Sequence, residues 1–256
     1  MAFGHRAAGE EPTGRTASAD RSETRILTLD GASAAAGARF ALLRWDGRDP
    51  PETLAERTVP GRDGAERLPA LLADALRAQG WGAGDLDMVA VVAGPGSFTG
   101  LRATLALAHG LRLGPGGMAL VPVTVGEALA PELRAHPEAG RASRLWCVSR
   151  ARIDRVFVEE VPADPAVPVP PPVAQMLSAL SASAGVLLLA GDAAAAVAAR
   201  ISAAGGVPIV AGPERPDGAA IAAAALRRVA GDLPPLAAQP LYVDPPEARP
   251  AAPAAR

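Results

Sequence analysis

An unbroken apolar run covers residues 88–93, where every side chain is hydrophobic. A run of this length predicts a strand that is buried on both faces. Glycine and proline at residues 94–96 interrupt the strand, and Ser97 is placed to cap a helix over residues 97–111. This helix is rich in Ala and Leu and apolar on nearly every side, so we expect other elements to cover most of it.

A second helix is predicted over residues 65–79, where apolar positions repeat at helical spacing. The positions that form this stripe are Leu68, Leu71, Leu72, Ala75 and Leu76. Pro69 falls near the first turn, where a missing backbone N–H costs little. From the pattern alone, the stripe either covers the chain's own sheet or joins the helix at 97–111 in a bundle with a partner.

Strand and helix patterns alternate along the rest of the chain. Strands are predicted at 26–30, 38–45 and 118–123, a hairpin at 145–149 and 155–161, and strand–helix alternation over 186–229. The two halves resemble each other as a duplicated α/β unit would, so we predict two α/β lobes, residues 25–123 and 124–232. Residues 1–24 have the composition of a disordered extension, and residues 233–256 form a Pro-rich tail.

The composition excludes several classes of protein. The formal net charge of −2 gives no overall electrostatic case for independent nucleic-acid binding, although a local arginine patch stays open. The single cysteine, Cys147, excludes an internal disulfide framework and a multi-thiolate zinc site, and we interpret it as a small buried hydrophobic residue. No apolar run reaches the roughly 18–20 residues that span a bilayer, and no secretory signal is evident, so we expect a cytoplasmic protein without membrane contact.

The glycine-rich turn at residues 94–97 has two interpretations. Successive backbone N–H groups at a helix N-terminus suit a phosphate group. However, all 25 basic residues are arginine, so the lysine of a phosphate-binding P-loop is absent. The other interpretation is a tight turn from strand to helix, which the spacing alone favours.

The nine residues 94–102, GPGSFTGLR, closely resemble the signature of the bacterial TsaB (YeaZ) family. Weaker similarity extends over about residues 25–247 and includes ILTLDGAS, ERLPALLADAL, PVTVGEALA and PLYVDPPEA. The resemblance implies an actin-like ATPase (ASKHA) fold of two similar lobes with a degenerate nucleotide site. It also implies the family's function as the non-catalytic dimerisation subunit of the complex that makes threonylcarbamoyladenosine in tRNA, beside the anticodon.

The same resemblance implies a set of partners. The chain would form a heterodimer with TsaD, the threonylcarbamoyltransferase, and the ATPase TsaE would dock on the assembled pair. tRNA would be bound only through the complex. Two further possibilities stay open: the free chain forms a homodimer, and ATP or ADP binds at the partner interface. No cofactor of the chain's own is expected.

Two groups of candidate site residues follow from the resemblance. The partner interface would comprise Leu68, Leu71, Leu72, Ala75, Leu76, Ser97, Phe98, Gly100, Leu101 and Leu105. The turn after the first strand, with Asp30, Gly31 and Ser33, would be a degenerate phosphate loop. It is degenerate because Gly31 stands where relatives usually carry a threonine hydroxyl.

We predict no metal site and no catalytic residue. The three histidines are His5, His109 and His136. They lie too far apart in sequence to form a metal motif like the His-x-x-x-His pair of TsaD. The chain departs from the family pattern at Gly31, Gly64, Arg150 and Asp244, which leaves a drifted function open. The alternative is a self-sufficient enzyme on this fold, either a small-molecule kinase or ATPase or a peptidase-like protein.

Overall fold

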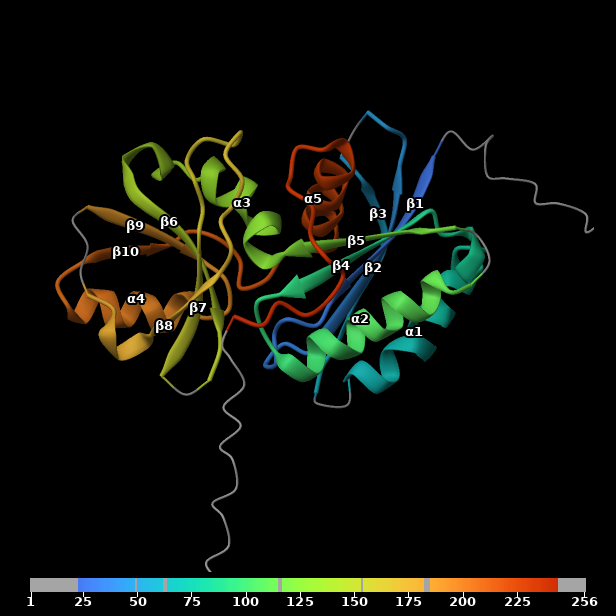
Figure 1. Ribbon diagram of the computed structural model, residues 1–256, viewed down its shortest axis with the longest axis horizontal. Coiled ribbons are helices and arrows are strands. Elements are labelled where there is room, and N and C mark those ends of the chain that lie inside the picture. The colour runs from blue at the N-terminus through green and yellow to red at the C-terminus, as the bar shows by residue number, and fades with distance from the viewer. Residues whose placement is uncertain are drawn as a thin grey trace, which may run out of the picture.

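Two lobes lie side by side, each built on one β-sheet with helices on its faces (Figure 1). The computed structural model describes residues 23–243, apart from residues 49, 62–63, 115–116, 153 and 182–184. Within these residues, ten strands form two five-stranded sheets. The predicted extension lies outside the described residues except at positions 23 and 24, and so does the part of the predicted tail beyond position 243.

The first sheet has the strand order β3-β2-β1-β4-β5. Strand β1 (Thr24–Asp30) pairs antiparallel with β2 (Ala38–Trp45), which pairs antiparallel with β3 (Glu52–Val59). On its other side β1 runs parallel to β4 (Met88–Gly94), and β4 runs parallel to β5 (Ala119–Thr124). All seven residues of β4 are buried, which confirms the strand predicted from the apolar run.

Alternate side chains of this sheet contribute to two separate cores. Leu27 of β1 packs with helices α1 (Gly64–Ala78) and α2 (Phe98–Arg112) on one face. Ile26 of β1 packs on the opposite face, where helix α5 (Gly218–Ala230) lies (Figure 1). The sheet needs cover on both faces because its parallel central strands are apolar on both.

The second sheet repeats the strand order of the first, as β10-β9-β6-β7-β8. Its central strand β6 (Ala142–Arg150) pairs antiparallel with β7 (Arg155–Glu160), which pairs antiparallel with β8 (Val173–Met176). On the other side β6 runs parallel to β9 (Val186–Ala190), and β9 runs parallel to β10 (Val207–Val210). The prediction of two similar lobes is therefore confirmed.

The remaining elements cover the second sheet and connect the strands. Helix α4 (Ala194–Ala203) packs on one face, and helix α3 (Val125–Ala135) packs on the other. Short 3-10 turns occur at η1 (Ala83–Asp85), η2 (Ala139–Arg141) and η3 (Leu177–Ala179). Of the helices in the described residues, none combines the length and the hydrophobicity that crossing a membrane requires.

Helix α5 departs from the predicted division of the chain. Residues 124–232 are predicted to form the second lobe, but α5 packs on β1, β2 and β5 of the first sheet. Its buried side chains, such as Ile221 and Ala225, cover the sheet face that α1 and α2 leave open. The chain therefore passes between the lobes twice, from β5 into α3 and again between β10 and α5.

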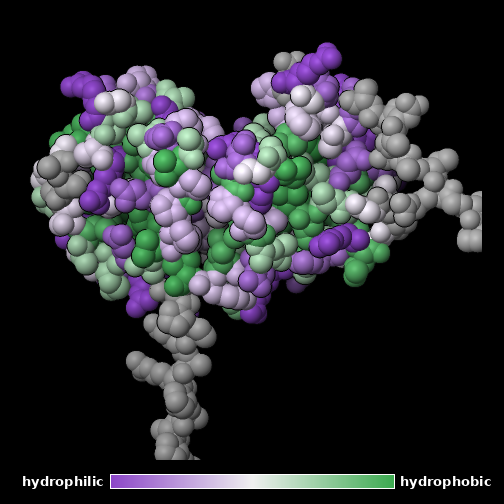
Figure 2. Space-filling model, turned by 45° about the horizontal axis from the view of Figure 1, so that its top comes forward, coloured by the Kyte–Doolittle hydropathy of each residue, from purple (hydrophilic) through white to green (hydrophobic). Residues whose placement is uncertain are grey.

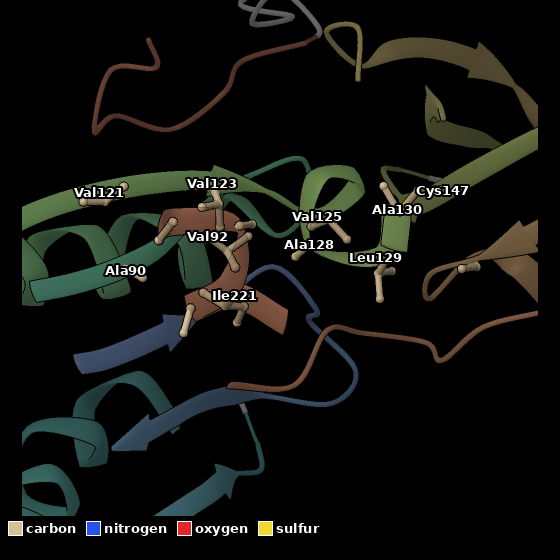
Figure 3. Packing of buried hydrophobic residues seen from close by; sticks show 14 of the residues in the cluster. Ala90, Val92, Val121, Val123, Val125, Ala128, Leu129, Ala130, Cys147 and Ile221 are labelled. Atoms are coloured by element: carbon tan, nitrogen blue, oxygen red, sulfur yellow. The ribbon is translucent and has the colours of Figure 1, made fainter. Parts of the chain in front are cut away.

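A continuous hydrophobic cluster joins the two lobes (Figure 3). It contains Val92 of β4, Leu129 of α3, Ile221 of α5 and Cys147 of β6. Burial raises the pKa of the Cys147 thiol well above its usual value, and Cys147 is a small buried hydrophobic residue, as predicted. Separating the lobes at this end would expose apolar surface to water, which is unfavourable.

Buried polar groups surround the beginning of α3. The Thr124 hydroxyl accepts a 3.0 Å hydrogen bond from the Glu127 N–H, and the Glu127 carboxylate accepts one of 2.6 Å from Arg228 of α5. Glu159 of β7 accepts a 2.8 Å hydrogen bond from the Gly126 N–H. Burial raises the pKa of Glu159 to about 8, the negative charge of Glu127 adds to the rise, and hydrogen bonds from Thr124 and Gly126 oppose it.

The variant Glu159→Gln should stabilise the protein most at alkaline pH. A carboxyl group with a raised folded-state pKa makes stability fall as the pH rises from the usual value of 4.5 to about 8, because the unfolded chain loses the proton first. Glutamine keeps a carbonyl acceptor for the Gly126 N–H and cannot ionise. Melting temperatures measured near pH 5 and near pH 9 should show a gain only at the higher pH, and an equal effect at both would contradict the raised pKa.

Candidate functional site

The glycine-rich turn after β4 lies directly against the turn after β1. The Ser97 N–H donates a 2.6 Å hydrogen bond to the Ala32 carbonyl, and the Ser97 hydroxyl caps α2 by accepting from the Gly100 N–H at 3.3 Å. Gly96 has a φ of 153°, and a Cβ atom there would lie 2.3 Å from the Ala32 carbonyl oxygen. Glycine is therefore required at this position, and the geometry supports the tight-turn interpretation.

Gly31 and Gly100 meet backbone to backbone within the same contact. A Cβ atom on Gly31 would lie 2.3 Å from the Gly100 carbonyl oxygen, and one on Gly100 would lie 2.1 Å from the Gly31 carbonyl oxygen. Both distances are far shorter than van der Waals contact. Gly31 therefore has a packing role here, because it allows α2 to approach the end of β1.

Asp30, at the end of β1, is 1% exposed and has its hydrogen bonds inside the protein. Its Oδ1 accepts a 2.8 Å hydrogen bond from the Ala32 N–H. Its Oδ2 accepts a 3.1 Å hydrogen bond from Nε of Arg215 and lies 2.9 Å from Nη2. The carboxylate of the predicted phosphate loop is thus paired with an arginine that is not among the predicted site residues.

Asp192 of the second lobe faces the same cleft. It lines a space of about 10 Å³ together with Asp30, Ser33 and Arg215. Burial raises the pKa of Asp192 and the charge of Asp30 adds to the rise, while hydrogen bonds from the Arg150 N–H and from Ser33 oppose it. On the molecular surface, a notch separates the lobes on the face that Figure 2 presents.

Most of the predicted interface residues lie in the protein's own core. The buried ones, none more than 5% exposed, are Leu68, Leu72, Ala75, Leu76, Leu101 and Leu105. Their assignment to a partner surface is therefore wrong, because they cover faces of the first sheet that would otherwise be exposed to water. Leu71 is half-buried, Ser97 and Gly100 belong to the turn contact, and Phe98 is 53% exposed.

The outer side of α2 makes contacts that the sequence did not predict. The Arg102 guanidinium lies 3.8 Å from the ring centroid of Phe98 and donates a 2.9 Å hydrogen bond to the Tyr242 hydroxyl. Nε2 of His109 lies 2.8 Å from the Ala238 carbonyl oxygen. Residues 238–242 therefore run along α2, although nothing in their Pro-containing sequence signals that contact.

The departures from the family pattern have local structural roles. A Cβ atom on Gly64 would lie 2.4 Å from the Val59 carbonyl oxygen, so a larger residue does not fit there. Arg150 donates from its backbone N–H to the Asp192 carboxylate at 2.7 Å and from Nε to the Asp192 carbonyl at 3.0 Å. Asp244 lies outside the described residues. Within the described part of the chain, no group of three His, Cys, Asp or Glu residues could hold a metal ion.

The repeated strand order and the cleft between the sheets define a two-lobed α/β protein. The family model described as TsaD, tRNA N6-adenosine threonylcarbamoyltransferase, matches residues 58–157. A tRNA N6-adenosine threonylcarbamoyltransferase from Cereibacter sphaeroides is 44% identical over 77 residues. That match covers 29% of this chain and only 21% of the relative, so the chain spans about a fifth of that protein's length.

Two solved structures from Pseudomonas aeruginosa share the fold over most of the chain. YeaZ has a TM-score of 0.60 and 22% identity, covering 86% of this chain and 99% of YeaZ. A protein described as similar to the peptidase YeaZ has a TM-score of 0.61 and 21% identity, covering 86% of this chain and 100% of that protein. The predicted fold is therefore confirmed, and these likenesses support the resemblance to the TsaB (YeaZ) family.

The variant Gly100→Ala should destabilise the protein, because its methyl group would overlap the Gly31 carbonyl oxygen at 2.1 Å. We expect a loss of about 1–3 kcal/mol, as for other overpacked sites. Gly110→Ala in the same helix is the matched control, since no neighbouring atom lies within 4 Å of its Cβ position. The control should gain up to about 1 kcal/mol from helix propensity. Urea unfolding measures both, and equal effects would contradict the close contact.

Proposed function

We propose that this chain is a TsaB (YeaZ)-type subunit that binds a TsaD-type threonylcarbamoyltransferase and supports it in modifying tRNA. The observation that carries the proposal is the YeaZ fold together with the GPGSFTGLR motif at its β4–α2 turn. The match of the TsaD family model over residues 58–157, which span α1 and α2, adds support. The complex, rather than this chain alone, would bind tRNA, and the ATPase TsaE would dock on the assembled pair.

We propose that the chain acts in this complex as a scaffold and not as a catalyst. The carboxylate of Asp30 is paired with Arg215 at 2.9 Å, and the space beside the pair is only about 10 Å³. A space of that size holds about one water molecule. Pockets for small molecules are typically about 300–1,000 Å³. A separate space of about 310 Å³ adjoins Gly31 and Ser33, but the Asp30 carboxylate does not line it, which makes a structural role the simpler interpretation.

The partner surface that we propose is the outer side of the layer formed by α1 and α2. Its exposed residues include Ala70 and Ala73 of α1, Ala106 of α2 and Leu113 directly after α2. Small side chains allow a partner helix to approach closely. Leu113 is 89% exposed, and covering such an apolar side chain with a partner removes it from water, which is favourable. A homodimer of the free chain would use the same surface.

A nucleotide at the partner interface is a further part of this proposal. A pocket of about 280 Å³ adjoins the beginning of α2, and Phe98, Arg152 and Tyr242 are among its lining residues. Aromatic rings and a guanidinium group suit the base and the phosphates of ATP or ADP. We propose that the nucleotide binds there only in the assembled pair, when the partner completes the site.

The variant Ala106→Arg tests the partner surface. The charge would be buried without a counter-charge in the complex, at a cost of about 3 kcal/mol or more, which weakens binding to the TsaD homologue at least a hundredfold. Ala199→Arg, at an exposed position of α4 in the other lobe, is the matched control and should bind normally. Isothermal titration calorimetry measures the affinity, and thermal melting verifies that both variants fold. Normal binding by Ala106→Arg would place the interface elsewhere.

An ATP hydrolysis assay separates the scaffold from a self-sufficient enzyme. We expect the isolated chain to show no hydrolysis above background, with or without magnesium, because Asp30 is buried and paired with Arg215. Phosphate release is measured for the wild type and for Asp30→Asn. Robust activity that the substitution abolishes would favour the enzyme and overturn the scaffold role.

A further inference from the structure

Arg215 lies in the segment that crosses from β10 of the second lobe to α5 on the first. Its side chain is 9% exposed, and its guanidinium group enters the turn between β1 and β2. There it contacts Oδ2 of Asp30 and donates to the carbonyl groups of Gly37 at 3.3 Å and Ala36 at 3.5 Å. A buried guanidinium group is thus surrounded by one carboxylate and two carbonyl oxygens.

The crossing segment is attached to both lobes on either side of Arg215. The Gly191 N–H of the second lobe donates a 2.9 Å hydrogen bond to the Pro213 carbonyl. Arg39 of β2, in the first lobe, donates a 2.9 Å hydrogen bond to the Pro216 carbonyl. Arg215 therefore contacts the first lobe at the point where the chain leaves the second.

The cleft beside Arg215 is rich in acidic and hydroxyl groups. Asp30 and Asp192 come from different lobes, and with Ser33 and Ser149 they line the same small space. Buried carboxylates require a counter-charge, either from a bound cation or from the protein itself. The guanidinium of Arg215 keeps its positive charge at all physiological pH values, so it meets this requirement for Asp30 without any ligand.

We propose that the Arg215 guanidinium is an internal counter-charge for Asp30 and acts as a latch, which holds the crossing segment, and through it the second lobe, against the first lobe. The closed arrangement then needs neither a bound metal ion nor a nucleotide. Arg215 lies just before α5, so the latch also fixes where α5 begins. It thereby helps to set the orientation of the first sheet relative to the second lobe. This inference concerns the isolated chain and does not rest on the proposed function, so a failure of partner binding leaves it intact.

Chemical rescue of Arg215→Ala tests the latch. Removing the guanidinium leaves Asp30 buried without its partner, and we expect the melting temperature to fall by on the order of 10 °C. Low-millimolar guanidinium chloride, far below denaturing concentrations, should bind in the vacated space and restore several degrees, while sodium chloride at the same concentration should not. The exposed Arg112→Ala variant of α2 is the matched control and should show neither the loss nor the rescue. A melting temperature like that of the wild type, or a loss without selective rescue, would overturn the proposal.

A double-mutant cycle covers the case in which Arg215→Ala does not fold. Asp30→Asn and Arg215→Gln each leave one charge unpaired, whereas the double variant leaves none and keeps hydrogen-bonding groups of similar shape. The double variant should therefore melt above both single variants, and its radius of gyration from small-angle scattering should match the wild type. Additive losses in the double variant would mean that the two residues act independently, and the latch would be rejected.

Discussion

The complete burial of β4 is the constraint on which the rest of the structure depends. With all seven of its residues buried, the first sheet must be covered on both faces. The segment between β3 and β5 provides α1 and α2 for one face, and α5, from the far end of the chain, covers the other. The chain must therefore return from the second lobe to the first, and Arg215 lies in that returning segment.

Local signals predicted much of this architecture. The apolar run at 88–93, its glycine break and the Leu stripe at 65–79 correspond to β4, the turn and α1, because these features are set by residues close together in the sequence. Strands β3 and β8 were not predicted. Both lie at sheet edges, where none of the residues of β8 and only Val59 of β3 is buried, so neither strand shows the alternation of a half-buried strand.

The candidate site could be predicted only in part, for a different physical reason. An amphipathic stripe shows that one helix face is covered, but it does not show whether the sheet or a partner covers it, and for Leu72 the answer is the sheet. The partner of Asp30 lies 185 positions away in a loop without periodicity, so no sequence pattern connects the two. The sequence did not reveal the Gly31–Gly100 contact either. A glycine in place of a larger residue is equally consistent with the loss of a functional side chain and with close packing of two backbones.

The first lobe has different properties on its two sides. On the cleft side, Asp30 is paired with Arg215 and the space beside the pair is only about 10 Å³, so the carboxylate of the predicted phosphate loop is already engaged within the protein. On the opposite side, α2 exposes small and apolar residues, and the chain segment at 238–242 lies along it through Arg102 and His109. A closed cleft removes one source of lobe movement, and a surface with a fixed shape loses less conformational entropy when a partner binds it.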